Sequence, residues 1–113
     1  MTTLFLVDVV TGKVRDVALE GVPKAAQIAR YRDDFSVLAV SSLNSNMVSL
    51  INPSFTRQTA ISVGSQPMDM AFRGDELFVG CQGDGSVHVI DIASRAWKAS
   101  FKAGTGCESL AFF

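Results

Sequence analysis

The stretch Val63–Phe101, VGSQPMDMAFRGDELFVGCQGDGSVHVIDIASRAWKASF, decides the fold of this chain. It contains four short apolar runs, which are Met68–Phe72, Leu77–Gly80, Val87–Ile92 and Ala96–Phe101. Turn signals rich in Gly, Asp and Ser separate these runs. Short apolar runs bounded by such clusters are typical of antiparallel strands joined by hairpins. The stretch therefore predicts a four-stranded antiparallel meander.

The rest of the chain repeats this pattern at a spacing of about 40 to 44 residues. In each copy an apolar strand ends in Asp or Asn, and a polar turn, a second strand and a Gly follow. The strand-ending residues are Asp8, Asn52 and Asp91. A side chain of this kind accepts backbone N–H groups across the following turn. Because every copy requires one, we interpret these three residues as architectural.

A small apolar run follows the Gly in every copy, at Ala25–Ala29, Met68–Phe72 and Ser109–Phe112. We interpret it as a strand buried on both faces. With the strands of a unit labelled A to D from this run onward, the chain reads C-D, A-B-C-D, A-B-C-D, A. The prediction is a single all-β domain of eleven strands, with approximate units at residues 1–22, 23–64, 65–104 and 105–113.

The combination VG-x-x-P-x-x-x-A-F, G-D-x-L-F-V and G-S-V-x-V-I-D-x-A in Val63–Ala93 resembles the YVTN-type β-propeller repeat. Residues 23–64 match less well, because Asn52-Pro53 replaces Asp91-Ile92. The resemblance covers essentially the whole chain. It implies one twisted four-stranded blade per repeat, with strand A nearest a central axis and strand D outermost. It does not imply a function, since propellers carry scaffolding, binding and enzymatic roles.

Closed propellers have about four to eight blades, whereas this chain supplies two complete units and three further strands. Blades that lack neighbours expose apolar faces, so we expect assembly. The partner is a second copy that completes a propeller, or other proteins in a larger assembly such as a virus particle or surface array. In a homo-oligomer, Ser109–Phe113 of one subunit would lie beside Leu4–Leu19 of the next, and two subunits would give six blades. The predicted assembly interface consists of Leu4, Leu6, Val14, Leu19, Leu110, Phe112 and Phe113.

Other classes of partner are disfavoured by composition. The net charge is −1 and the charges are scattered, which argues against nucleic acid or an anionic membrane surface. No apolar run approaches the roughly 20 residues that span a bilayer. The N-terminus lacks the features of a signal peptide, so we expect a cytoplasmic protein or a component of an assembled particle. G-x-S-x-G, P-loop and C-x-x-C-H motifs are absent from the sequence, and we expect neither enzymatic activity nor a cofactor.

Several single residues remain as candidates for chemistry. His88 is the only histidine and has no second metal ligand at a suitable spacing, so a packed or rim position is expected. Gly83-Asp84-Gly85-Ser86 resembles a calcium loop faintly, but it lacks further carboxylates and is interpreted as a hairpin turn. Cys81 and Cys107 are expected to be thiols, with a mutual disulfide as the alternative.

Two aromatic residues, Trp97 and Tyr31, are candidate contacts to a ligand or protein partner. Asp69 and Glu108 flank the start of strand A and lie either at the surface or along a central cavity. A ligand- or glycan-binding oligomeric propeller is therefore an alternative function. A third hypothesis is a fragment of a larger propeller protein whose redox chemistry resides in domains absent here.

Overall fold

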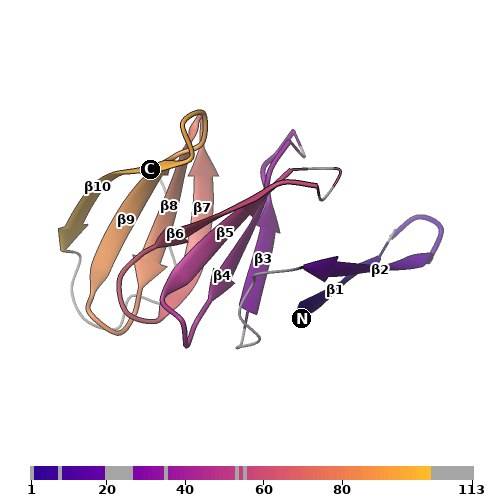
Figure 1. Ribbon diagram of the computed structural model, residues 1–113, viewed down its shortest axis with the longest axis horizontal. Coiled ribbons are helices and arrows are strands. Elements are labelled where there is room, and N and C mark those ends of the chain that lie inside the picture. Colours follow the sequence, from indigo (N-terminus) through magenta and orange to yellow (C-terminus); the bar gives the residue numbers. More distant parts are fainter. Residues whose placement is uncertain are drawn as a thin grey trace.

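The computed structural model describes residues 2–7, 9–19, 27–34, 36–52, 54 and 56–102 of the chain. This part of the chain forms ten β-strands in three antiparallel sheets (Figure 1). A two-stranded hairpin contains β1 (Thr2–Val7) and β2 (Val14–Leu19). The first four-stranded sheet contains β3 (Gln27–Tyr31), β4 (Leu38–Ser42), β5 (Met47–Ile51) and β6 (Gln58–Ser62). The second contains β7 (Pro67–Arg73), β8 (Glu76–Cys81), β9 (Ser86–Asp91) and β10 (Ala96–Lys102).

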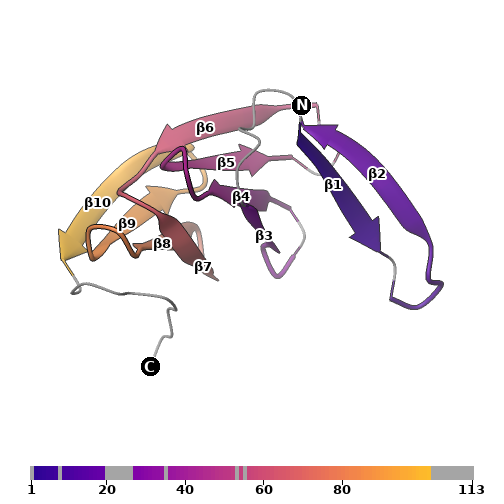
Figure 2. The same cartoon turned by 90° about the horizontal axis from the view of Figure 1, so that it is seen from below.

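Strands that are consecutive in the sequence are neighbours in each sheet, so both larger sheets are meanders. Figure 2 shows the sheets arranged as a fan, with β3 and β7 on its inner side and β6 and β10 on its outer side. The predicted all-β fold and the strand order C-D, A-B-C-D, A-B-C-D are confirmed. The eleventh predicted strand, Ser109–Phe112, lies outside the described residues.

Local turn chemistry explains where the strands end. The turn between β8 and β9 closes at Gly85 with φ 66°, and the equivalent turn of the first sheet closes at Asn46 with φ 54°. Gly and Asn are the residues that adopt this left-handed conformation most readily. At the ends of strands C, Asp91 Oδ2 accepts a hydrogen bond from Ser94 N at 3.2 Å and Asn52 Oδ1 accepts one from Arg57 N at 2.7 Å. The architectural role predicted for these two residues is confirmed, while Asp8 lies outside the described residues.

The core lies between the two four-stranded sheets. Register places Ala39, Val48, Leu50 and Ile61 on the face of the first sheet that meets Met70, Leu77, Val79, Cys81 and Ile90 of the second. Of these, Leu50, Met70, Leu77 and Val79 are completely inaccessible to solvent. The inner strand β7 lies against β4 and β3. The two sheets therefore stabilise each other by burying one apolar face each.

The expectation that strand A is buried on both faces is wrong. In β7 only Pro67 and Met70 are buried, and in β3 both Ala29 and Arg30 are exposed. The strand buried along its whole length is β4, and β5 is buried from Val48 to Ile51. The reason is position in the sheet: β3 and β7 are edge strands, whereas β4 and β5 have a strand on each side. Residues 25 and 26 of the first predicted strand A lie outside the described residues.

Candidate functional site

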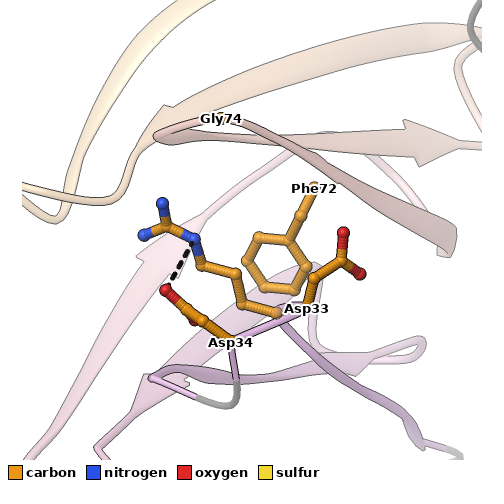
Figure 3. Close-up of a pocket in the computed structure, with 5 residues that line it drawn as sticks. Asp33, Asp34, Phe72 and Gly74 are labelled. Atoms are coloured by element: carbon orange, nitrogen blue, oxygen red, sulfur yellow. Dashed lines mark ion pairs between the residues drawn. The ribbon is translucent and has the colours of Figure 1, made fainter.

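A hollow of about 210 Å³ opens between the β3–β4 connection and the β7–β8 turn. Arg32, Asp33 and Asp34 line it from the first sheet, and Phe72 and Gly74 line it from the second. Figure 3 shows the Phe72 ring between the two connections, with the carboxylates of Asp33 and Asp34 pointing away from each other. Gly74 has φ 58°, which the two-residue turn after β7 requires. The hollow thus lies at the contact between the two neighbouring sheets.

Ion pairs already occupy the guanidinium group in this hollow. Arg32 Nη2 lies 2.8 Å from Asp75 Oδ1 of the second sheet. Arg32 Nε lies 3.8 Å from Asp34 Oδ2, and the dashed line in Figure 3 marks this pair. Hydrogen bonds from the Ser36 hydroxyl and backbone N–H, aided by Arg32, hold the pKa of Asp34 below its usual value. Two carboxylates therefore compensate the Arg32 charge, and the arrangement suits attachment of one sheet to the next.

Two further arginines cross between the sheets. Arg30 Nη2 of β3 lies 3.2 Å from Asp69 Oδ1 of β7, which joins the two inner strands. Arg95 lies in the turn between β9 and β10, and its Nη1 donates a hydrogen bond to the backbone oxygen of Leu50 at 3.2 Å. An exposed ion pair such as Arg30–Asp69 contributes about 0–1 kcal/mol. The two contacts fix the relative placement of the sheets more than they stabilise the fold.

The linker between the sheets, residues 63–66, is held from both sides. From the first sheet, Asn46 accepts hydrogen bonds from Val63 N at 2.9 Å and from Gln66 N at 3.0 Å. From the second sheet, Asp84 Oδ2 accepts one from Ser65 N at 3.1 Å. Both turns between strands B and C thus bind the same linker.

Asp84 belongs to the turn that resembled a calcium loop. Its Oδ1 accepts hydrogen bonds from the Ser86 hydroxyl at 2.6 Å and from Ser86 N at 3.1 Å. These bonds, with that from Ser65 N, lower the pKa of Asp84 although partial burial opposes them. Across the described residues, no group of three or more His, Cys, Asp or Glu is placed to hold a metal ion. The geometry supports the hairpin interpretation and adds the contact to the linker, which the sequence did not reveal.

His88 and Trp97 form a pair on neighbouring strands of the second sheet. Trp97 Nε1 donates a hydrogen bond to His88 Nδ1 at 2.8 Å. Because Nδ1 accepts this bond, it carries no proton. Burial lowers the pKa of His88; Asp84 opposes this shift and Lys102 reinforces it. The Trp97 side chain remains about half exposed. His88 is half-buried beside Trp97, which agrees with the expected packed or rim position.

The two aromatic residues predicted to contact a ligand do not come together. Tyr31 ends β3, the inner strand of the first sheet, and is half-buried. Trp97 lies on β10, the outer strand of the second sheet. Each therefore remains a separate prediction. Asp69 is half-buried on inner strand β7, whereas Glu108 and Cys107 lie outside the described residues; Cys81 is fully buried in the core.

The predicted assembly residues fall in part on the N-terminal hairpin. Of these, Val14 is 60% exposed. Two residues that were not predicted, Phe5 and Val7, are 64% and 58% exposed on the same face of the hairpin. Phe5 and Val7 alternate with Leu4 and Leu6 along the strand, and this alternation is the sequence signal that could have identified the second face. The side chains of Leu4, Leu6 and Leu19, and all of Leu110, Phe112 and Phe113, lie outside the description.

In the described part of the chain, no helix has the length and apolar character needed to cross a membrane.

No model of a known protein family matches the sequence, and no curated protein does so either. Solved structures do match it. Hydrazine synthase from Kuenenia stuttgartiensis matches with a TM-score of 0.78 at 24% identity, over 95% of this chain and 32% of that one. The RRP9 WD40 repeats match with a TM-score of 0.75 at 15% identity, over 88% of this chain and 32% of that one. Apo AztD from Citrobacter koseri matches with a TM-score of 0.70 at 12% identity, over 92% of this chain and 30% of that one.

These likenesses concern the fold, because each sequence identity is below 25%. The chain spans about a third of the length of the solved structures it matches. The matched structures are of the propeller type, and the order of strands within each four-stranded sheet agrees with a propeller blade. The chain therefore folds as blades of a β-propeller.

Proposed function

We propose that this chain is a non-enzymatic structural or protein-interaction module whose incomplete third sheet is completed by other polypeptide. The observation that carries the proposal is the hairpin β1–β2, which takes the place of strands C and D. In the complete sheets, strand C pairs on both edges, as β5 and β9 do. Within the described residues β1 pairs along one edge only, with β2.

Two physical arguments support this proposal. An isolated two-stranded hairpin is marginally stable in water, and a third strand or a packed face is needed for stability. The hairpin also exposes Phe5, Val7 and Val14 on one face. Apolar side chains gathered on a repeat unit at the end of a stack favour association with a neighbour.

The partner is a second copy in a homo-oligomer that completes a propeller, or another protein of a larger assembly such as a virus particle or surface array. The repeat pattern supports a further strand A at Ser109–Phe113 and supports the YVTN type of repeat. Ligand or glycan binding has weaker support, because Tyr31 and Trp97 lie on different sheets and the indole N–H of Trp97 is already bonded to His88. The likeness to hydrazine synthase does not extend an activity to this chain at 24% identity.

Small-angle X-ray scattering tests the proposal. A single chain has a Cα radius of gyration of 13.7 Å. We expect a clearly larger particle if the chain assembles with itself. If another protein normally covers the incomplete sheet, we expect the chain alone to aggregate or to unfold readily. A stable, soluble particle with a radius near that of one chain would refute both forms of the proposal.

A further inference from the structure

We propose that two copies of the chain pair through the open edge of β1, the edge opposite β2, and join their hairpins into one four-stranded antiparallel sheet. The inference rests on the proposed function in one respect, that the chain assembles. The shared sheet replaces the arrangement expected from sequence, in which Ser109–Phe113 would lie beside the hairpin.

The open edge of β1 lacks the features by which proteins block sheet edges. Such edges usually carry charged residues, Pro or bulges, because unpaired backbone groups invite pairing with another chain. The strand β1 reads TTLFLV, with no charge, Pro or Gly and with four consecutive apolar residues from Leu4 to Val7. Short uncharged segments of high strand propensity are those that pair with other chains. This edge is therefore suited to accept a strand.

The other edge strands of the described chain are less suited to it. Charged residues or Pro occur in four of them, as Arg15 and Asp16 in β2, Arg30 in β3, Pro67 and Asp69 in β7, and Lys98 and Lys102 in β10. The register of β10 also shifts between Trp97 and Ala99, as a bulge does. In β6 three of five residues are polar. An uncharged apolar edge is matched best by another of its kind, so the occupant is β1 of a second copy.

Two-fold symmetry restricts the register of this pair. A two-fold axis normal to the sheet relates the antiparallel strands, so every residue faces one that lies on the same side of the sheet. Pairing centred on Phe5 meets this condition: Phe5 lies opposite Phe5 of the partner subunit, and Thr3 lies opposite Val7. Because Phe5 and Val7 share the exposed face, this register buries part of both and forms a cross-strand aromatic pair.

A matched pair of variants tests the surface. Phe5→Lys places two positive charges opposite each other across the two-fold axis, and we expect the dimer mass to fall two-fold to the 12.1 kDa of one chain. Ala18→Lys changes an exposed residue on the same face, but on β2, and we expect the dimer to persist. Circular dichroism checks that both variants fold. Light scattering that gives both variants the same mass would overturn the proposal.

Cross-linking tests the register and does not depend on disrupting the dimer. In a chain that carries Cys81→Ala and Cys107→Ser, we expect Phe5→Cys to oxidise to a covalent dimer, since opposed residues have Cα atoms about 4.5–5.5 Å apart, within disulfide range. Val14→Cys on β2 lies more than three strand spacings, over roughly 14 Å, from its copy and should not cross-link. If the wild-type chain assembles but Phe5→Cys stays uncrosslinked, pairing through β1 is wrong and the proposed function stands. If the wild-type chain is a stable monomer, both are wrong.

Discussion

Asp84 illustrates how one carboxylate can hold two sheets in place. Its two oxygens accept hydrogen bonds from Ser65 N in the linker and from Ser86 at the start of β9. The linker approaches so closely that a Cβ built on Gly64 would lie 2.5 Å from Asp84 Oδ2. The Gly that recurs after strand D thus meets a packing requirement at this position, in addition to turning the chain.

Replacement of Asp84 should therefore cost stability. We expect Asp84→Ala to lower the free energy of unfolding by about 1–3 kcal/mol, because partly buried donors lose their acceptor. Asp33→Ala, at an exposed position in the hollow, serves as the control and should change it by less than about 0.5 kcal/mol. Urea unfolding followed by circular dichroism measures both. Equal midpoints for the two variants would contradict the role given to Asp84.

The pair of His88 and Trp97 predicts a pH dependence. The chain has one histidine and one tryptophan, so the fluorescence of Trp97 reports on His88. Burial holds the pKa of His88 in the folded protein below 6.5. A depressed histidine pKa means that the unfolded chain binds the proton more readily. The stability contributed by neutral His88 is therefore present above pH 6.5 and is lost as the pH falls through the folded pKa.

We expect Trp97 emission to titrate with a midpoint below 6.5, because protonated His88 cannot accept the indole hydrogen bond. His88→Gln keeps an acceptor without a titrating group, and its emission should stay level between pH 5 and 7. A midpoint at or above 6.5 in the wild-type protein, or an equal titration in the variant, would count against the assignment.

At the scale of elements, the central strands β4 and β5 form the most buried part of the chain. Leu38 and Leu50 lie on opposite faces of the first sheet, and their exposed fractions are 2% and 0%. The face with Leu50 meets the second sheet, whereas that with Leu38 points the other way. The loss of side-chain volume on either face of this sheet should therefore lower the stability of the fold.

Truncation on either face should be costly. We expect Leu38→Ala and Leu50→Ala each to reduce the free energy of unfolding by about 2–5 kcal/mol, through lost burial and the cavity left behind. Phe101→Ala on β10 removes a larger side chain from a position that is 51% exposed, and it should cost less than either. Thermal and urea unfolding measure the free energy of unfolding of the three variants. A Leu38→Ala cost no greater than that of Phe101→Ala would show that its face is not a core.

The elements were predictable from sequence to the extent that they depend on neighbours in the chain. Gly85 and the Asp-rich hairpin signals placed the turns, and strand-ending Asp91 and Asn52 acted as expected. The Arg32–Asp75 pair joins residues 43 apart, and nothing local in the sequence indicates that their turns meet. The exposure of Arg30 follows from being on an edge strand, a property of the whole sheet.

At the scale of the whole molecule, the described part of the chain consists of two stacked blades and a hairpin that stands at one end of the fan (Figures 1 and 2). Each blade buries one face against the other, and the hairpin leaves one strand edge and one apolar face without a partner among the described residues. These unpaired surfaces support our proposal that the chain associates with another polypeptide.

The mass of the purified wild-type chain in solution, measured by light scattering over a range of concentrations, tests this inference most directly. We expect a multiple of 12.1 kDa, with a dimer as the form that pairing through β1 produces, or else a chain that aggregates when it is isolated from its partner. A soluble 12.1 kDa monomer that unfolds cooperatively and remains monomeric at high concentration would contradict it.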